Sequence, residues 1–231
     1  MDSDTPVQRE RIFETLLFLN DLIPRPVQLQ MAVDEVLLES AQLPILRVYR
    51  WESPCVTIGY FQSHSLAMAA HPGLAVVRRW TGGGLVLHGM DAPYSLIVPG
   101  GEPFAAVRPA ASYRAIHGAL AEALRGRLAE VTLAEEDAPK QSAACFENPV
   151  SADLLCRGAK VGGAGQRRTR RGLLHQGSLQ LGGAPFDDAR AFTGRLAKEV
   201  RDYDLPLEIL SLAERLVPTR YGRAGWNCGR L

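Results

Sequence analysis

Residues 78–88, with the sequence RRWTGGGLVLH, constrain the fold of this chain more than any other stretch. Three successive glycines lie between a pair of arginines and a hydrophobic run. A glycine within a strand weakens it by roughly 0.5–1 kcal/mol relative to alanine, so such a run is tolerated mainly where the backbone passes close to another group. Bare N–H groups beside guanidinium groups suit an anionic or carbonyl-bearing ligand. The stretch indicates a ligand site, and the alternative is a flexible hairpin loop between strands at 74–79 and 85–88.

The size and charge of the chain favour one soluble domain. It has 231 residues, of which 46% are hydrophobic and 22% charged, which is enough for one sizeable core. The formal net charge of +1 gives no general attraction to nucleic acid or to a membrane surface. Its apolar runs are far shorter than the roughly 20 residues of a membrane span, and its polar, acidic start is unlike a signal peptide. We therefore expect a cytoplasmic protein with no nucleic-acid and no membrane partner.

The spacing of apolar residues predicts a mixed β-sheet flanked by helices, in the α/β (α+β) class. Residues 1–25 are expected to form an N-terminal arm, 26–219 a single catalytic domain and 220–231 a C-terminal tail. In the amphipathic helix at 27–41, Asp34 and Glu35 lie opposite the apolar residues and are expected to be surface groups of the helix or groups that brace a loop. The remaining predicted helices are 112–128, 187–200 and 207–216, and the predicted strands are 46–51, 55–61, 74–80, 85–88, 94–98, 152–157 and 173–181.

A second glycine-rich, basic stretch at 158–171 is expected to be a loop joining the last two strands. If these strands are neighbours of the first glycine stretch, the two loops form the walls of one cleft for an elongated ligand with a polar head. Lys160 could donate to a carbonyl, a phosphoryl oxygen or an oxyanion, and the alternative is a solvated loop charge. Neither stretch has P-loop or Rossmann spacing, which disfavours a mononucleotide-binding fold. A surface patch for an acidic partner is expected at Arg167, Arg168, Arg170 and Arg171.

The four cysteines include no Cys-x-x-Cys pair, so we expect free thiols and no metal site. Cys55 and Cys156 lie in β-like runs and are expected to be small buried hydrophobic residues. Cys145 differs, because it lies in the turn-rich segment 142–149, where a side chain can face a cleft.

Five segments together resemble the lipoate-protein ligase and octanoyltransferase family, part of the biotin and lipoate ligase superfamily, over most of residues 27–181. They are QMAVDE at 30–35, VTIGYFQ at 56–62, RRWTGGGLVLH at 78–88, KVGGAGQ at 160–166 and LHQGSL at 174–179. The resemblance implies a mixed sheet whose two glycine stretches enclose an acyl chain and its activated carboxyl. It also implies a biotin/lipoate ligase-like catalytic domain, here without the C-terminal accessory domain of many ATP-dependent members.

Cys145 makes the chain most similar to the cysteine-dependent octanoyltransferases. It precedes Lys160 by 15 residues and is followed by Phe146 and an acidic residue, as at the nucleophile of that group. The resemblance implies acyl transfer from acyl carrier protein, through a Cys145 thioester, to a lysine of a lipoyl-domain protein. The acceptor would be a glycine cleavage H-type protein or a dehydrogenase E2 subunit, and no cofactor is needed. The implied catalytic residues are Cys145 and Lys160, and the implied substrate-binding residues are Arg78, Arg79, Thr81, Gly82, Gly83, Gly84, His88, Gly162, Gly163, Ala164, Gln166 and His175.

Several alternatives stay open at this point. The triple glycine is more ligase-like, and an ATP-dependent lipoate-protein ligase would need ATP and Mg²⁺. Gly89 stands where many relatives have aspartate, which puts a metal or adenylate role there in doubt. His88 and His175 are candidate proton carriers, with satisfied interior histidines as the alternative. A non-catalytic acyl- or biotinyl-binding subunit and a biotin ligase are further possibilities, and the sequence does not separate octanoyl from lipoyl substrates.

Overall fold

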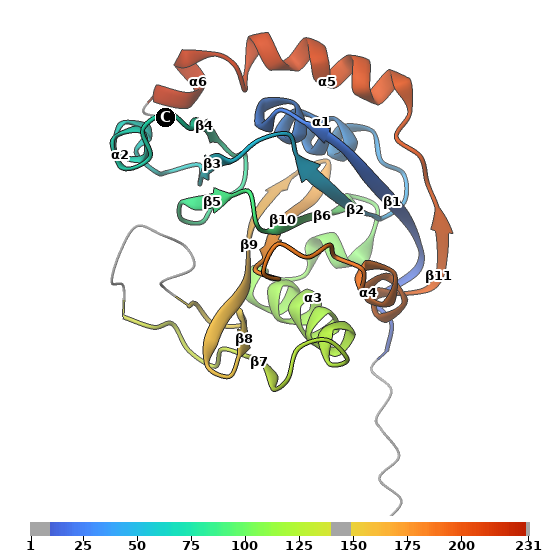
Figure 1. Cartoon of the computed structure of the whole chain (residues 1–231). Helices are drawn as coiled ribbons and strands as arrows, with labels where there is room; N and C mark the ends of the chain where they lie inside the picture. Colours follow the sequence, from blue (N-terminus) through green and yellow to red (C-terminus); the bar gives the residue numbers. More distant parts are fainter. Residues whose placement is uncertain (1–9, 140–148, 230–231) are drawn as a thin grey trace, which may run out of the picture.

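The computed structural model describes residues 10–139 and 149–229, in which two β-sheets are flanked by helices (Figure 1). Its elements are β1 (Phe13–Arg25), α1 (Val27–Ser40), β2 (Ile45–Trp51), β3 (Cys55–Ile58), α2 (His64–Ala70), β4 (Ala75–Arg78), β5 (Val86–His88), β6 (Ala92–Pro99), η1 (Pro103–Ala106), α3 (Pro109–Leu124), β7 (Val131–Leu133), β8 (Leu154–Cys156), β9 (Ala159–Thr169), β10 (Gly172–Leu179), α4 (Ala189–Leu196), β11 (Ala197–Asp202), α5 (Leu207–Thr219) and α6 (Ala224–Cys228). One 8-stranded sheet has the order β11-β1-β2-β6-β10-β9-β8-β7, and a 3-stranded sheet has the order β4-β3-β5. The predicted fold class is confirmed.

Strands β6 and β10 lie in the middle of the large sheet and are buried along their whole length. They pair antiparallel, with Tyr94 opposite Gly177 and Leu96 opposite His175. Helices α1 and α5 lie over one face of the sheet, and α3 and α4 lie over the other (Figure 1). Both faces are covered, and β6 is accordingly mostly apolar, whereas β10 also carries the buried polar residues His175, Gln176 and Ser178. The two large hydrophobic clusters lie on the two sides of the sheet.

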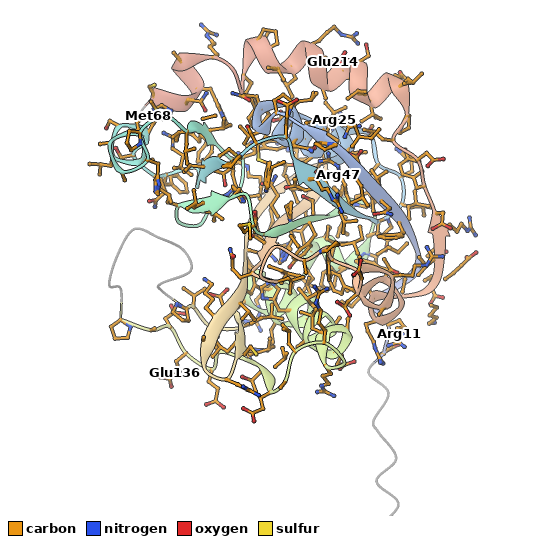
Figure 2. The ribbon with its side chains drawn as sticks, in the orientation of Figure 1. Arg11, Arg25, Arg47, Met68, Glu136 and Glu214 are labelled. Carbon is orange, nitrogen blue, oxygen red and sulfur yellow. The ribbon has the colours of Figure 1, made fainter. Side chains whose placement is uncertain are left out.

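Helix α1 forms where the apolar period predicts it, but its acidic residues are buried. Asp34 is fully buried because it faces the large sheet, where it accepts hydrogen bonds from Arg47 of β2 at 2.7 Å and from Gln176 of β10 at 2.8 Å. Figure 2 shows Arg47 among the side chains inside the molecule. Glu35 is nearly buried because it faces the segment that follows α5, where it accepts a hydrogen bond from the Tyr221 hydroxyl at 2.6 Å. The surface alternative was therefore wrong for both carboxylates, because the sequence period does not reveal what packs against each side of α1.

Two segments predicted as an arm and as a helix instead form an edge of the large sheet. Residues 13–25 form β1, which pairs in parallel with β2 on one side and β11 on the other. The predicted helix at 187–200 ends at Leu196, and the chain continues as β11. Apolar and charged residues do not alternate regularly in either strand, so the two-residue period that predicts a strand is weak. Pairing between distant parts of the chain determines these strands.

The stretch at 158–171, expected to be a loop, forms the 11-residue strand β9. It pairs antiparallel with β10 along its length, from Gly162 opposite Leu179 to Thr169 opposite Gly172. Glycine and arginine have low intrinsic strand preference, but two neighbouring strands supply the hydrogen bonds that hold this backbone extended. The predicted loop was therefore wrong, because local residue preference does not include the hydrogen bonds that neighbouring strands provide.

The described cysteines are free thiols, as expected. Cys55 is buried as predicted, whereas Cys156 is only half-buried and donates to the carbonyl oxygen of Ala129. Cys145 lies outside the described residues. Over the described ranges, the helices are too short or too polar to cross a membrane.

Candidate active site

A narrow pocket lies where the small sheet meets β9 and β10. Its walls include Arg79, His88, Gly163 and Ala164, which the sequence analysis named as candidates. The other lining residues come from α1, β2, β3, β5, β9 and β10: Met31, Tyr49, Trp51, Thr57, Val86, Gly165, Gln176, Gly177 and Ser178. The pocket therefore combines an apolar wall with a few polar groups, as ligand sites commonly do.

Lys160 lies at the start of β9, with its ammonium group against the strand. Its Nζ lies 2.6 Å from Oδ2 of Asp153, and both side chains are almost completely buried. A Cβ at Gly163 would lie 2.8 Å from Lys160 Cε and 3.0 Å from Nζ. Gly163 therefore leaves the space that the Lys160 side chain occupies. Asp153 was missed in the sequence analysis because nothing near it in the sequence marks it as a partner of Lys160.

Asp153 is held from three directions. Its Oδ1 accepts a hydrogen bond from the Tyr113 hydroxyl at 2.7 Å, and its Oδ2 accepts one from the Val150 N–H at 2.8 Å. Burial, followed by the charge of Asp153, raises the pKa of Tyr113 well above its ordinary value of 10, so the phenol keeps its proton and donates it. The same hydroxyl accepts from the N–H of Ala164 at 2.7 Å. Tyr113 therefore joins the Lys160–Asp153 pair to the pocket wall.

The arginine–glycine loop, residues 79–84, is held in shape by Arg79. The Nη2 group of Arg79 donates to the carbonyl oxygens of Gly82 at 3.0 Å and Gly84 at 2.8 Å. An added Cβ at Gly165 would collide with the Gly82 carbonyl oxygen, and the Gly82 N–H points to Gln166 O at 3.4 Å. The arginine–glycine loop thus packs directly against β9, which confirms that the two glycine stretches are in contact.

A chain of hydrogen bonds runs from Arg79 to Asp91. Arginine can only donate, so Thr57 Oγ1 accepts from Arg79 Nη1 at 2.7 Å. Thr57 Oγ1 is also hydrogen-bonded to His88 Nε2 at 2.7 Å, and Nδ1 of His88 lies 2.6 Å from Oδ2 of Asp91. His88 therefore braces Arg79 through Thr57, and its Nε2 is already occupied. Gly89 stands where many relatives have aspartate, and in this chain the carboxylate beside His88 comes from Asp91.

A second chain holds Thr81. Its hydroxyl donates to Gln176 Oε1 at 2.8 Å, and Gln176 Nε2 donates to Asp34 Oδ2 at 2.8 Å. Asp34 in turn pairs with the fully buried Arg47. Thr81, a predicted site residue, is therefore tied to the interior beneath α1. Gln176 lies within the matched segment 174–179, yet only strand pairing reveals that it faces this pocket.

Other predicted residues lie away from the pocket lining. Gly162 faces the core, where an added Cβ would lie 2.7 Å from Leu179 Cδ2. Gln166 lies beside His175, with Nε2 3.1 Å from Nδ1 of that ring. The predicted basic surface patch is also divided: Arg168 donates to Ala105 O, while Arg170 and Arg171 are exposed. Arg167 stacks 5.0 Å above the Tyr60 ring.

His175 is fully buried in a polar cluster with Tyr94 and His117. The Tyr94 hydroxyl lies 3.3 Å from Nε2 of each histidine, and His117 Nδ1 lies 2.7 Å from the Ala152 carbonyl oxygen. Burial, then the neighbouring His117 and Arg168 charges, lowers the pKa of His175 well below 6.5. The structure therefore places His175 in the interior as a neutral ring, rather than at the pocket as a proton carrier.

This cluster predicts a loss of stability in acid. Burial lowers the pKa of His117 from 6.5 to about 4, so this ring takes up a proton more readily in the unfolded chain. Its contribution is fully present above pH 6.5 and decreases as the pH falls toward 4, by about 3 kcal/mol in total. We expect His117→Gln to flatten the dependence of the unfolding free energy on pH, measured by urea unfolding from pH 7 to 4. His71→Gln, a change at a partly exposed histidine after α2, is the control, and an equal flattening there would contradict the assignment to His117.

Comparisons with known proteins identify the family of this chain. Residues 26–203 match the family model of the lipoyl protein ligase A/B catalytic domain. The chain is 29% identical over 261 residues to the octanoyltransferase LipM of Brevibacillus brevis, covering 87% of this chain and 95% of that protein. It is 35% identical over 167 residues to the octanoyltransferase LipM of Kyrpidia tusciae, covering 65% of this chain and 61% of that protein. Several such relatives are therefore matched over only about three fifths of their length.

Solved structures share the fold. A lipoate protein ligase, Ta0514 of T. acidophilum with bound lipoic acid, has a TM-score of 0.75 at 22% identity, covering 95% of this chain and 100% of that one. A lipoate-protein ligase A bound with ATP has a TM-score of 0.73 at 23% identity, covering 95% of this chain and 100% of that one. With a family model that spans most of the sequence, the chain belongs to the lipoyl protein ligase A/B catalytic-domain family.

Proposed function

We propose that this chain is an octanoyl or lipoyl transferase of protein lipoylation, as the LipM relatives support. One observation carries the proposal. The Lys160 ammonium lies against Gly163, and the arginine–glycine loop lies against Gly165 of the same strand. Residues two apart on a strand share a face and are separated by about 7 Å. A cation and a glycine loop thus lie beside two pocket-lining residues, Gly163 and Gly165, and we infer that the activated carboxyl binds at this section of β9.

The reaction proceeds in two transfers. The Cys145 thiolate attacks the carbonyl carbon of an acyl thioester on acyl carrier protein, and the carrier thiol leaves with a proton. The amine of a lysine on a lipoyl-domain protein then attacks the Cys145 thioester, which forms the amide and releases the thiol. Each step passes through a tetrahedral oxyanion, and a thioester intermediate divides one difficult transfer into two easier ones. An H-type protein or a dehydrogenase E2 subunit provides the acceptor lysine.

Lys160 holds the oxyanion, and Asp153 holds Lys160. A preorganised donor aimed at the position of developing charge is worth about 3–4 kcal/mol in such reactions. Lys160 is suited to this because Asp153, Tyr113 and Gly163 fix where its ammonium group lies. The acyl tail extends along the apolar wall that contains Met31, Trp51 and Val86. This reaction needs no cofactor beyond its acyl substrate, whereas ATP and Mg²⁺ belong to the ligase alternative.

The test is acyl transfer without ATP. The chain is incubated with octanoyl-acyl carrier protein and a lipoyl domain, and the intact mass of the acceptor is followed. We expect the acceptor to gain one octanoyl group at a rate that ATP does not change. Modification only with ATP and free lipoate or octanoate would establish the ligase reaction instead. Saturable acyl binding with only substoichiometric modification would establish a binding subunit.

A neighbouring pair of glycines tests the role of Lys160 without removing it. Gly163→Ala places a Cβ 2.8 Å from Cε of Lys160 and 3.1 Å from Oδ1 of Asp153, so we expect the ammonium to shift and the buried ion pair to lose part of its stabilising effect. A displacement of about 1 Å at a catalytic group can cost up to about 100-fold in rate, so kcat should fall by about 10- to 100-fold. Steady-state transfer kinetics and thermal unfolding give both quantities.

Gly162→Ala is the matched control, because its added Cβ meets Leu179 and Leu154 in the core. It should lower the melting temperature while leaving kcat per folded molecule nearly unchanged. If the two variants lose activity equally, the position of Lys160 is not what limits the rate.

A further inference from the structure

Helix α6 closes the free edge of the small sheet. Among the described residues, β4 is an edge strand that pairs with β3 alone, so its outer N–H and C=O groups need other partners. At Arg78 these partners are two side chains of α6. The Arg78 N–H donates to Asn227 Oδ1 at 2.9 Å, and the Trp226 indole N–H donates to the Arg78 carbonyl oxygen at 2.9 Å. Two α6 side chains therefore occupy the place of a neighbouring strand.

The Arg78 side chain extends this connection to the segment after β3. Its guanidinium is buried and donates to the carbonyl oxygens of Trp226 at 3.1 Å and Asn227 at 2.9 Å. The same group donates to the carbonyl oxygens of Tyr60 at 2.6 Å and Gln62 at 2.8 Å. The planar guanidinium thus joins α6 to residues 59–62, so Arg78, a predicted substrate-binding residue, binds backbone instead.

Residues 59–62 in turn contact the arginine–glycine loop. The Tyr60 N–H donates to the Thr81 carbonyl oxygen at 2.9 Å. Gly59 lies so close to the Gly83 carbonyl that an added Cβ would overlap its oxygen atom. Packed interiors transmit small displacements because they contain little free space. Arg78 and residues 59–62 therefore connect α6 to Thr81 and Gly83 of the arginine–glycine loop.

We propose that Trp226 and Asn227 are positioning residues for acyl transfer, which act through Arg78 and residues 59–62 on the arginine–glycine loop. Both lie beyond residues 26–203, the part of the chain that the family model matches. The role in transfer rests on the proposed function, whereas the coupling from α6 to the loop does not. The C-terminal helix is thus part of the architecture of the acyl site.

The variants remove side-chain contacts of α6. Trp226→Phe loses the indole N–H but keeps an aromatic ring near Tyr60 and Tyr221. Asn227→Ala loses the oxygen that accepts from Arg78 and the amide that donates to the Tyr221 and Arg223 carbonyl oxygens. Asn227→Asp keeps an oxygen for Arg78 and replaces the amide donor by a second oxygen. The matched control is Thr193→Ala, which removes a part-buried side-chain hydrogen bond of 2.7 Å within α4. Hydrogen exchange of peptides covering 79–85 and steady-state transfer kinetics are measured for each variant.

We expect Trp226→Phe and Asn227→Ala to speed exchange at residues 81–84 by about fivefold, as loss of one hydrogen bond does. We expect kcat to fall by about tenfold, with KM for the acyl donor changed by less than about twofold. Asn227→Asp should restore most of the exchange protection at residues 81–84 and most of kcat, and Thr193→Ala should change neither quantity. Unchanged exchange at 81–84 in the folded variants, or an equal effect from Thr193→Ala, would overturn the inference. So would an Asn227→Asp variant that behaves like Asn227→Ala. If the unmodified chain transfers no acyl group, the proposed function fails, and the exchange data alone decide the coupling.

Discussion

Replacing Cys145 by alanine should abolish ATP-free transfer of the octanoyl group, with a loss of at least about 10³-fold in kcat/KM. The reason is chemical, since without the thiolate no thioester forms and the acceptor amine must attack the carrier thioester directly. Cys145 lies outside the described residues, so its proposed place beside Lys160 rests on the sequence resemblance. Intact mass of the acceptor measures the transfer. Intact mass of the enzyme also reports the octanoyl adduct, which should appear on the unmodified chain and be lost in Cys145→Ala.

Cys156→Ser is the matched control for this prediction. Its thiol is half-buried in β8 and donates to a backbone carbonyl, a bond that a hydroxyl can also form. Transfer by this variant should stay within about twofold of the unmodified chain. If Cys145→Ala retains full activity, the nucleophile is not Cys145, and ATP-dependent ligation becomes the reaction to measure.

Replacing Lys160 by methionine should lower kcat by about 10²- to 10³-fold, because the tetrahedral oxyanion loses its cation. The change also leaves Asp153 buried without its partner, which costs about 3–5 kcal/mol of stability in comparable buried pairs. The double variant Lys160→Met with Asp153→Asn removes that charge. We therefore expect the double variant to recover the melting temperature and to stay inactive. Transfer kinetics and thermal unfolding of both variants separate catalysis from folding.

Lys198→Met is the control for loss of a lysine as such. This residue lies at the surface in β11. Its ammonium pairs with Glu14, and its side chain is 56% exposed. Exposed ion pairs contribute little, so activity and stability should both stay nearly unchanged. Recovery of transfer along with stability in the double variant would show that Lys160 supports the fold rather than the reaction.

The elements that could be predicted from sequence are those whose pattern is set locally. Helix α1 has an apolar period, and β6 is a mostly apolar run that is buried along its length. Strands β1 and β11 were missed because they pair with strands that are not their neighbours in a hairpin. Strand β9 adjoins both of its partners in the chain, and it was missed because its glycines and arginines have a low local strand preference. In β9 the glycines are required by close approaches, of Lys160 to Gly163 and of Gly82 to Gly165. Glycine content alone does not separate such a strand from a loop.

The same limit applies to the candidate site. Arg78 and Arg79 are adjacent and chemically alike, so the sequence assigned both to substrate. Successive residues of an extended chain point to opposite sides, and here Arg78 faces α6 whereas Arg79 faces Thr57 and the pocket. The two histidines divide in the same way: His88 lines the pocket, and His175 lies in the interior with Tyr94.

The sequence by itself determined the family, the class of sheet and the segments from which the site is built, because spaced motifs and apolar periods are local properties. Tertiary structure alone decided which side chains meet. Asp153 beside Lys160, Gln176 beneath Thr81 and α6 behind Arg78 are all brought together by strand pairing and helix packing. Contacts of this kind depend on the register of distant segments, and no local pattern of residues encodes that register.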